Sequence, residues 1–455
     1  RTAHNPPAPE FLDLCDEYGM LVMNEAFYEW KVVKTWAIDY GIRDFFDEWA
    51  ETDVRDMVRR DRNHPSVILW SIGNEIPMVD RMEGVEAAKK LASAVRSEDP
   101  TRPVTCGVNL IDAGNKTGFF DVLDVAGYNY HQQYYDRDHK AFPDRKIVGS
   151  ENKHDRVTRG VYDIGQGIGP NYYSMYGTAG ERAWKNVKNR DFVAGYFIWT
   201  GFDYHGEHHG RAVPHWPGKN SNRGVIDLCG FVTDHFYLYQ SEWTDEPMVH
   251  FFPHWNWQGH EGKEIPVWVY SNCEKVELFL DGESLGTKDF SDTSDLHLEW
   301  KVPYEPGTLK AVGIKDGQTV CSRQKATTGE PAAVKLVSHK KKIAADNQDV
   351  SFVKVQIVDS EGRVVPTADN LVKFDISGPG QIIGVGNGDP VCHDSFQAKK
   401  RNAFNGLCLA VVESDRRTGK ITLTASADGL ESDRTTIKAV SGEPTEVIAT
   451  AESAA

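Results

Sequence analysis

VILWSIGNEI, residues 67–76, is the stretch of sequence that decides the fold. Its first part, VILWSI, is almost entirely apolar and predicts a buried strand at 67–72. Gly73, Asn74 and Glu75 follow at once, so an amide and a carboxyl stand at the C-terminal end of this strand. An Asn-Glu pair alone is more often part of a solvated loop. Because barrels of parallel strands carry their active sites at this end of the strands, we take Asn74 and Glu75 as candidate functional residues.

Helices and strands alternate on both sides of this stretch. Apolar residues at helical spacing predict helices at 9–18, 46–58, 83–98 and 179–190. Apolar runs predict buried strands at 21–23, 67–72, 103–107, 122–128, 146–151 and 193–204. This alternation indicates a parallel sheet, either open and doubly wound or closed as a (β/α)8 TIM barrel. No glycine-rich nucleotide loop opens a helix, which favours the barrel, and with six strands counted we expect its first two strands to precede Arg1.

The pattern changes after about residue 245 to short alternating runs separated by Gly, Asn, Asp and Pro, such as VWVYS and VELFLDG. A second region of this kind follows the linker TTGEP, residues 327–331. Period-two alternation between turn residues is typical of immunoglobulin-like β-sandwich domains. The predicted organisation is a catalytic barrel domain at 1–244, β-sandwich domains at 245–328 and 329–441, and a tail at 442–455.

A second strand-end carboxyl, Glu151, closes the predicted strand KIVGSE, three barrel strands after Glu75. Two such carboxyls suit glycoside hydrolysis, in which one acid protonates the leaving oxygen and the other attacks the anomeric carbon. The acid needs a raised pKa and the nucleophile a low one. Two unrelated loop acids are the alternative, and they would make the shared placement a coincidence.

Composition limits the classes of function. The 455 residues carry a formal net charge of −16, with 40% hydrophobic residues, so we expect a globular protein that does not bind nucleic acid. No run of 18 apolar residues predicts a membrane helix. The seven cysteines stand singly without metal-type spacing, and they leave the redox compartment open. The chain starts without an initiator methionine or a signal peptide, so upstream sequence is expected to be missing.

Five segments in order resemble glycoside hydrolase family 2, which contains β-galactosidases, β-glucuronidases and β-mannosidases. They are RTAHNPPAPEFLDLCDEYGMLVMNEAF, RDRNHPSVILWSIGNEI, GSENKHD, WTGFDYHGE and DLCGF with the following YLYQSEW. The resemblance implies a retaining, exo-acting hydrolase in which Glu75, at the end of the fourth barrel strand, is the acid/base. Glu151, at the end of the seventh strand, would be the nucleophile that forms the covalent glycosyl-enzyme. Jelly-roll and immunoglobulin-like domains upstream of the barrel are also implied.

The resemblance further implies a set of sugar-binding residues. Asn74 would hydrogen-bond the sugar 2-hydroxyl, and Trp199 would form the floor of the sugar pocket. Tyr130 resembles the tyrosine that hydrogen-bonds the nucleophile, with Tyr128 as the competing candidate. The remaining candidates are the histidines His4 and His154, although a lone histidine is more often structural.

The sequence also departs from the family pattern. Asn24 stands where the family has an Asp, and Tyr28 replaces an Asp found a few residues later, which puts the local hydrogen-bond network in doubt. Arg223 lies close to where uronic-acid-cleaving relatives use a lysine, and it could hold a carboxylate or sulfate. These features keep open a β-glucuronidase, a β-galacturonidase or a hydrolase of sulfated galactosides.

GNEI, GSENKHD and WTGFDYHGE are more similar to the bacterial β-galactosidase branch, so the expected substrate is the end of a β-galactoside oligosaccharide or polysaccharide. A non-catalytic carbohydrate-binding protein is the alternative from another class. The resemblance favours a periplasmic or secreted location in a bacterium and leaves a homo-oligomer open. No cofactor is expected, and no metal ligands are assigned, although a structural or activating metal ion stays an open question.

Overall fold

The computed structural model describes residues 1–32, 34, 41–153, 155–205 and 216–442. The chain forms two compact units. Unit 1 consists of Arg1–Asp155 and Thr178–Trp199, and unit 2 consists of Arg156–Gly177 and Thr200–Ala455.

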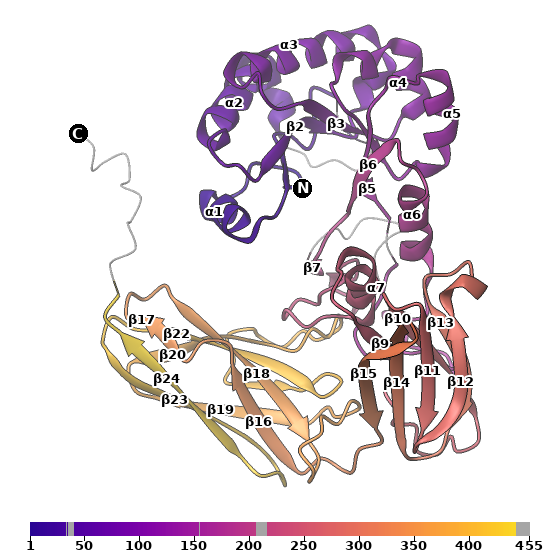
Figure 1. Ribbon diagram of the computed structural model, residues 1–455. Coiled ribbons are helices and arrows are strands. Elements are labelled where there is room, and N and C mark those ends of the chain that lie inside the picture. Colours follow the sequence, from indigo (N-terminus) through magenta and orange to yellow (C-terminus); the bar gives the residue numbers. More distant parts are fainter. Residues whose placement is uncertain (33, 35–40, 154, 206–215, 443–455) are drawn as a thin grey trace. The chain divides into compact units, whose positions relative to one another are not determined.

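Unit 1 is built on one parallel sheet whose six strands lie side by side in the order of the sequence. The strands are β1 (Val22–Glu25), β2 (Val67–Asn74), β3 (Val104–Val108), β4 (Ala126–Asn129), β5 (Ile147–Asn152) and β6 (Val193–Ile198). The helices are α1 (Pro9–Tyr18), α2 (Phe46–Asp61), α3 (Met82–Glu98), α4 (Ile111–Thr117), α5 (Tyr135–Ala141) and α6 (Ala179–Lys188). Figure 1 shows α2 to α5 arching around one side of these strands. This arrangement is that of six consecutive strands of a (β/α)8 barrel.

Helix α1 shows how local sequence sets an element. Pro9 stands in its first turn, where a missing N–H costs nothing, and Leu12 and Cys15 bury its apolar face. Gly19 ends the helix with φ +69°, a left-handed conformation that glycine adopts without steric cost. The helix therefore has the bounds that the sequence predicts.

The core of unit 1 lies between the sheet and its helices. Strand β1 is buried along its whole length and β2 along nearly all of it, in agreement with the apolar runs from which they were predicted. Trp30 and Trp70 are fully buried in this core, together with the apolar faces of α2 and α3. The indole nitrogens are satisfied by the carbonyl of Ile72 and by Asp99, so both rings are held in one orientation at the level of β2.

One predicted strand begins later than the sequence indicates. Residues 122–125 of the predicted strand 122–128 lie outside β4, and a 3-10 turn, Phe119–Val122, precedes them. The amides of Asp124 and Val125 both donate to the carbonyl of Val104, and the Asp124 carboxylate accepts from the amide of Val104. The Asp124 side chain thus competes for a donor that a strand ladder would use, and β4 is left with four residues.

Unit 2 contains α7 (Asp234–Trp243), the short pair β7 (Tyr204–His205) and β8 (Asn220–Ser221), and two β-sandwiches. The first sandwich packs the sheet β13-β10-β9 on the sheet β12-β11-β14-β15, around a core that includes Phe251, Trp255 and Trp300. Its strands are β9 (Val249–Phe252), β10 (Glu264–Ser271), β11 (Lys275–Leu280), β12 (Glu283–Asp289), β13 (Leu298–Pro303), β14 (Thr308–Lys315) and β15 (Gln318–Ala326).

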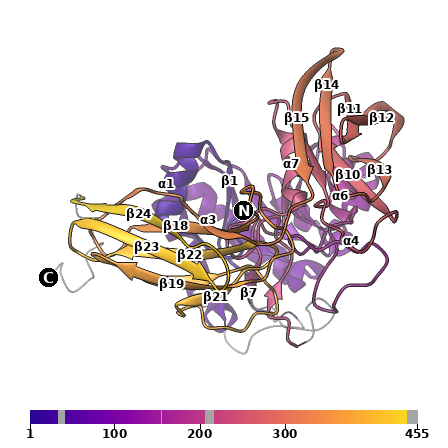
Figure 2. The same ribbon diagram turned by 90° about the horizontal axis from the view of Figure 1, so that it is seen from below.

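The second sandwich packs the sheet β16-β18-β22-β20 on the sheet β17-β24-β23-β19-β21. Its strands are β16 (Ala333–Ser338), β17 (Lys342–Ala344), β18 (Val350–Val358), β19 (Leu371–Ser377), β20 (Gly380–Gly386), β21 (Lys400–Asn402), β22 (Leu407–Ser414), β23 (Gly419–Ala427) and β24 (Asp433–Val440). Figure 2 shows these strands, orange to yellow, running roughly alongside one another, as in an aligned sandwich. Alternate residues of β18 and β22 are buried, which is the period-two pattern of the sequence.

A buried arginine joins the segment before α6 to the second sandwich within unit 2. The Arg159 side chain is 8% exposed, and its Nε donates to Asp227 at 2.7 Å. Its Nη2 donates to the carbonyl oxygens of Asn387 and Phe404, both at 2.9 Å. The guanidinium is thus paired with a carboxylate and also hydrogen-bonded to backbone, which a buried charge requires.

The division into compact units groups residues 156–177 and 200–244, which the sequence placed in the barrel domain, with the two sandwiches. The predicted domain boundaries stay a prediction. All seven cysteines are free, and among the described helices none is long and apolar enough to cross a membrane.

Candidate active site

Glu75 follows the last residue of β2, and its position is fixed by its backbone. Asn74 pairs with Gly107 of β3, and the amide of Glu75 donates to the Gly107 carbonyl at 2.7 Å. Glu75 has φ +48°, in the left-handed region that a residue with a side chain seldom occupies. Such backbone conformations persist where the surroundings impose them, and they gather at functional sites.

Glu151 is the fifth residue of the six-residue strand β5 and lies opposite Asn129 of β4. Its backbone carbonyl accepts a hydrogen bond from the amide of Tyr130 at 2.8 Å, and Tyr130 has φ +61°. The ends of β2, β4 and β5 thus meet at one edge of the sheet. Both predicted catalytic carboxyls lie at that edge.

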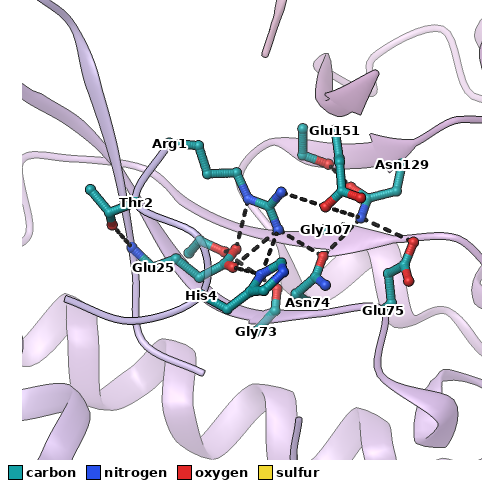
Figure 3. A network of polar contacts seen from close by, with 12 residues as sticks. Arg1, Thr2, His4, Glu25, Gly73, Asn74, Glu75, Gly107, Asn129 and Glu151 are labelled. Atoms are coloured by element: carbon teal, nitrogen blue, oxygen red, sulfur yellow. Dashed lines mark hydrogen bonds and ion pairs between the residues drawn. The ribbon is translucent and has the colours of Figure 1, made fainter. Parts of the chain in front are cut away.

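Asn129, fully buried, brings the two carboxyls together (Figure 3). Its Nδ2 lies 3.3 Å from Glu75 Oε1 and 3.3 Å from Glu151 Oε2. The two oxygens are therefore separated by at most twice 3.3 Å, about 6.6 Å, a limit that admits the ~5 to 5.5 Å of retaining glycosidases and reaches only the lower edge of the inverting range. Nδ2 also donates to Asn74 Oδ1 at 2.8 Å, and Oδ1 of Asn129 accepts from Ser150 at 2.6 Å.

The Asn74–Asn129 pair depends on a glycine. A Cβ at Gly107 would lie 2.9 Å from Asn129 Oδ1 and 3.0 Å from Asn74 Oδ1, closer than a carbon and an oxygen pack. Because glycine has no Cβ, the two amides can approach each other beside β3.

Arg1 links a third carboxyl to the site, as Figure 3 shows. Its Nε and Nη2 each donate to one oxygen of Glu25 at 3.0 Å, so this pair is bidentate. Its Nη1 donates to Glu151 Oε2 at 2.6 Å, and Nη2 also donates to Asn74 Oδ1 at 2.7 Å. His4 Nδ1 lies 2.7 Å from Glu25 Oε1. One buried guanidinium therefore orients two carboxylates and an amide.

The three carboxyls of the site, Glu75, Glu25 and Glu151, differ in their electrostatic surroundings. Burial raises the pKa of Glu75, and the neighbouring Glu151 charge raises it further. Burial alone would also raise the pKa of Glu25, but Arg1, His4 and Ser71 lower it to about 2. The ion pair with Arg1 stabilises the negative charge of Glu151. Glu75 is thus suited to hold a proton, whereas Glu151 is paired with a cation.

Aromatic side chains line the site next to Arg1. The His4 ring stacks on Trp199 with the centroids 5.1 Å apart, and it lies 5.1 Å from the ring of Tyr28. The Trp199 amide donates to the carbonyl of Asn152, at the end of β5. His4 and Trp199, predicted separately as sugar-binding residues, thus lie in contact.

The chain matches family models over most of its length. Residues 1–214 match the TIM barrel domain of glycosyl hydrolases family 2, and residues 334–436 match the C-terminal domain 5 of glycoside hydrolase family 2. Residues 262–321 match a domain of unknown function. The chain belongs to glycoside hydrolase family 2. The prediction of this family, and of a TIM barrel followed by β-sandwich domains, is confirmed.

Individual members of the family are similar to most of the chain. Beta-galactosidase BoGH2A of Bacteroides ovatus is 41% identical over 94% of this chain, and a putative beta-glucuronidase of Formosa agariphila is 34% identical over 86%. A solved family 2 structure from Bacteroides cellulosilyticus is 36% identical over 96% of this chain, with a TM-score of 0.84. The chain spans 56%, 40% and 57% of the lengths of these three proteins, respectively.

Tyr128 and Tyr130, the two candidates for the tyrosine that hydrogen-bonds the family nucleophile, have different surroundings in the structure. The Tyr128 side chain is fully buried and donates to Asp138 at 2.8 Å, so it is directed to α5. Tyr130 directly follows Asn129, and its backbone amide donates a hydrogen bond to the backbone carbonyl of Glu151. Tyr130 therefore remains the candidate that would hydrogen-bond the family nucleophile.

Two further predicted residues, His154 and Arg223, stay predictions. His154 lies outside the described residues. Arg223 belongs to unit 2, where its amide donates to the carbonyl of Ser221, and its predicted contact with an anionic sugar stays a prediction.

Three residues of this network were not predicted: Arg1, Glu25 and Asn129. Glu25 ends a buried strand, which is the same signal that identified Glu75 and Glu151. Asn129 lies in GYNYH directly before Tyr130, and a polar residue at the end of a buried strand is again the signal. Arg1 is the first residue of the chain, and no pattern around it marks its role.

The departure at Asn24 leaves no polar atom unpaired. Asn24 Nδ2 donates to Asp61 at 2.7 Å, and its Oδ1 accepts from Thr2 at 3.2 Å. Asp61 accepts two further hydrogen bonds from Arg60. The local network is therefore complete with an amide at this position.

Among the described residues, Asp13, Asp16 and His64 form the group whose ligand atoms lie close enough for a metal ion. His64 Nδ1 is 2.7 Å from Asp16, and the other Asp16 oxygen accepts from the amide of Ser66. These contacts explain the group as a link between α1 and the start of β2, and metal use by the protein stays an open prediction.

Proposed function

We propose that the protein is a retaining, exo-acting β-galactosidase in which Glu75 is the acid/base and Glu151 the nucleophile. The observation that carries the proposal is the Asn129 bridge, which holds the two strand-end carboxyls within about 6.6 Å of each other. Their unlike surroundings support the division of roles, because Glu75 is buried beside a negative charge and Glu151 is paired with Arg1.

In the first step Glu75 gives its proton to the glycosidic oxygen while a carboxylate oxygen of Glu151 attacks the anomeric carbon. The bond to the leaving group breaks, and a covalent glycosyl ester forms on Glu151. In the second step Glu75, now ionised, takes a proton from water, which attacks the anomeric carbon and releases Glu151. The pKa of Glu75 falls once the charge of Glu151 is consumed in the ester, which favours the change from acid to base.

Asn74 is oriented to donate to the substrate. The Oδ1 atom of Asn74 already accepts hydrogen bonds from Arg1 Nη2 and Asn129 Nδ2. Because a guanidinium nitrogen can only donate, the atom that faces Arg1 must be the oxygen of the Asn74 amide. The Nδ2 group forms no hydrogen bond with the described residues. We infer that it donates to the sugar 2-hydroxyl, an interaction that strengthens as the transition state forms. Trp199 and His4 would provide a flat surface for the C–H face of the ring.

Galactose is proposed because the relative with 41% identity is named a beta-galactosidase. The 34% identical relative is named a putative beta-glucuronidase, which keeps a uronide as the second candidate. Turnover of 4-nitrophenyl β-galactoside and of the matching glucuronide by the full-length protein separates the two, and a carbohydrate-binding protein would hydrolyse neither. Glu151→Gln should abolish turnover of either substrate, and full activity of that variant would contradict the proposal.

We also propose a periplasmic or secreted location in a bacterium, supported only by resemblance to bacterial family members. Fractionation of cells that express the full-length protein tests it, and recovery with the cytoplasmic marker would contradict it. Light scattering on the purified protein decides whether it forms a homo-oligomer.

A further inference from the structure

The Lys34 ammonium is buried and forms no ion pair with a described group. The residue is 3% exposed, and its Nζ forms no hydrogen bond with the described residues. Nζ lies over the ring of Tyr28, 3.7 Å from the centroid. Glu29, which is also buried, has no hydrogen-bond partner in the part of the chain that the structure describes, so it is not the counter-ion of Lys34. A buried ammonium without a partner is costly, and proteins keep one where a ligand or a reaction uses it.

The ammonium belongs to the sugar site. Tyr28, under Nζ, lies against His4, and His4 stacks on Trp199. Burial lowers the pKa of Lys34, and the carboxylates of Glu75, Glu151 and Glu25 act in the opposite direction. The charge of Lys34 therefore senses all three carboxylates of the site, yet none of the three forms an ion pair with it within the part of the chain that the structure describes.

Tyr28 gives the ammonium no counter-charge. Its ring centroid lies 3.7 Å from Nζ, and an aromatic face attracts a cation more weakly than a carboxylate does. This contact therefore leaves Nζ without an ion pair to a described residue.

We propose that Lys34 binds an anionic group, a carboxylate or a sulfate, on the sugar that occupies this site. The proposal rests on the proposed function and specifies its substrate class: a β-galactoside or related glycoside that carries a negative charge near the scissile bond. Binding would give the ammonium a charge-assisted hydrogen bond in a water-poor site, where such bonds are strong. A neutral galactoside would leave the ammonium unpaired.

The test compares kcat/KM for four aryl glycosides: 4-nitrophenyl β-galactoside, its 6-sulfate, the β-galacturonide and the β-glucuronide. With the full-length wild-type protein, one or more of the charged substrates should exceed the neutral one, and the pattern among them distinguishes sulfate from carboxylate. Lys34→Met should lower the charged-to-neutral ratio roughly tenfold to a hundredfold, as expected for the loss of one hydrogen bond between charged groups.

Lys31→Met is the matched control. Lys31 is a lysine of the same segment that is ion-paired with Asp47 at 2.5 Å, so its loss should leave the ratio unchanged. The proposal is overturned if the neutral galactoside is the best wild-type substrate and Lys34→Met leaves the ratio unchanged. An equal fall for neutral and charged substrates would also overturn it, because Lys34 would then act on the catalytic carboxylates and not on the substrate.

A second variant tests the same idea by adding a group. Tyr28→Asp would place a carboxylate beside Nζ, and we expect it to lower the charged-to-neutral ratio as Lys34→Met does. An unchanged or increased ratio in this variant would argue against a binding role for the ammonium. Absence of all turnover in the wild-type protein would refute the proposed function itself, whereas turnover with a ratio insensitive to both variants would refute only the role of Lys34.

Discussion

Asn129→Ala tests how much of the catalytic geometry depends on one amide. The substitution removes the donor that lies 3.3 Å from both Glu75 and Glu151, and it leaves Asn74 and Ser150 without one partner each. Hydrogen bonds to charged groups contribute about 1.5 to 3 kcal/mol, and the longer contacts here favour the lower part of that range. With a further loss from the freed Asn74, we expect kcat/KM to fall by about 2 to 3 kcal/mol, or roughly 30- to 150-fold.

Asn129→Ala should also shift the pH dependence of kcat/KM in a defined direction. The hydrogen bond from Asn129 lowers the pKa of Glu75, although burial and Glu151 raise it more. Its removal should raise that pKa further, so the alkaline limb of kcat/KM, on which the acid loses its proton, should move to higher pH. The assay is the hydrolysis of an aryl β-galactoside by the full-length protein between pH 4 and 9.

Asn115→Ala is the control for the loss of a partly buried amide elsewhere. Asn115 of α4 is hydrogen-bonded to Asp138 and Arg145 and not to the catalytic residues, so kcat/KM should stay within about twofold of the wild type. A wild-type rate in Asn129→Ala, or an alkaline limb that moves to lower pH, would refute the reasoning.

Three further predictions concern activity, stability and covalent structure. Gly107→Ala should lower kcat at least tenfold, because its Cβ would press on Asn129 and Asn74, whereas Gly329→Ala, whose Cβ would meet nothing closer than 3.8 Å, should be neutral; equal rates would contradict this. The folded pKa of Glu25 is about 2, against 4.5 as its ordinary value, so this carboxylate adds about 3 kcal/mol of stability above pH 4.5 that is lost as the pH falls toward 2. Urea midpoints at pH 6 and pH 3 should therefore converge in Glu25→Gln, and a wild-type pH dependence in that variant would count against it. The sulfurs of Cys273 and Cys321 lie 3.6 Å apart, so glutathione disulfide should join them by thiol–disulfide exchange; non-reducing peptide maps that show both thiols free would exclude the link.

The helices and strands of unit 1 could largely be predicted because their signals are local. Helix α1 has the predicted bounds, and each of the six predicted strands overlaps an observed one, although residues 199–204 of the last prediction lie beyond the end of β6. The difference at 122–125 arises from a contact between Asp124 and Val104, which belong to neighbouring elements and whose pairing no local pattern reveals. Position at a strand end was likewise sufficient to find Glu75 and Glu151.

The polar network of the site was harder to predict because it depends on which strand ends meet. Asn129 acts on Glu75 and Glu151 only because β4 lies between β3 and β5. Arg1 and Glu25 form their pair across an interval of sequence that contains a whole helix. The lack of a hydrogen bond on the Lys34 ammonium could be recognised only when its burial and its contact with Tyr28 were known.

Arg159 constrains how this protein could be shortened by evolution or by engineering. The segment that carries it follows β5 in the chain, and three of the hydrogen bonds of Arg159 end on Asp227, Asn387 and Phe404. Deleting the second sandwich would remove two carbonyl partners of the guanidinium, whose side chain is now 8% exposed, and would open it to water. The last domain is therefore part of the packing around Arg159, and a shortened chain would keep only the pair with Asp227 among these three contacts.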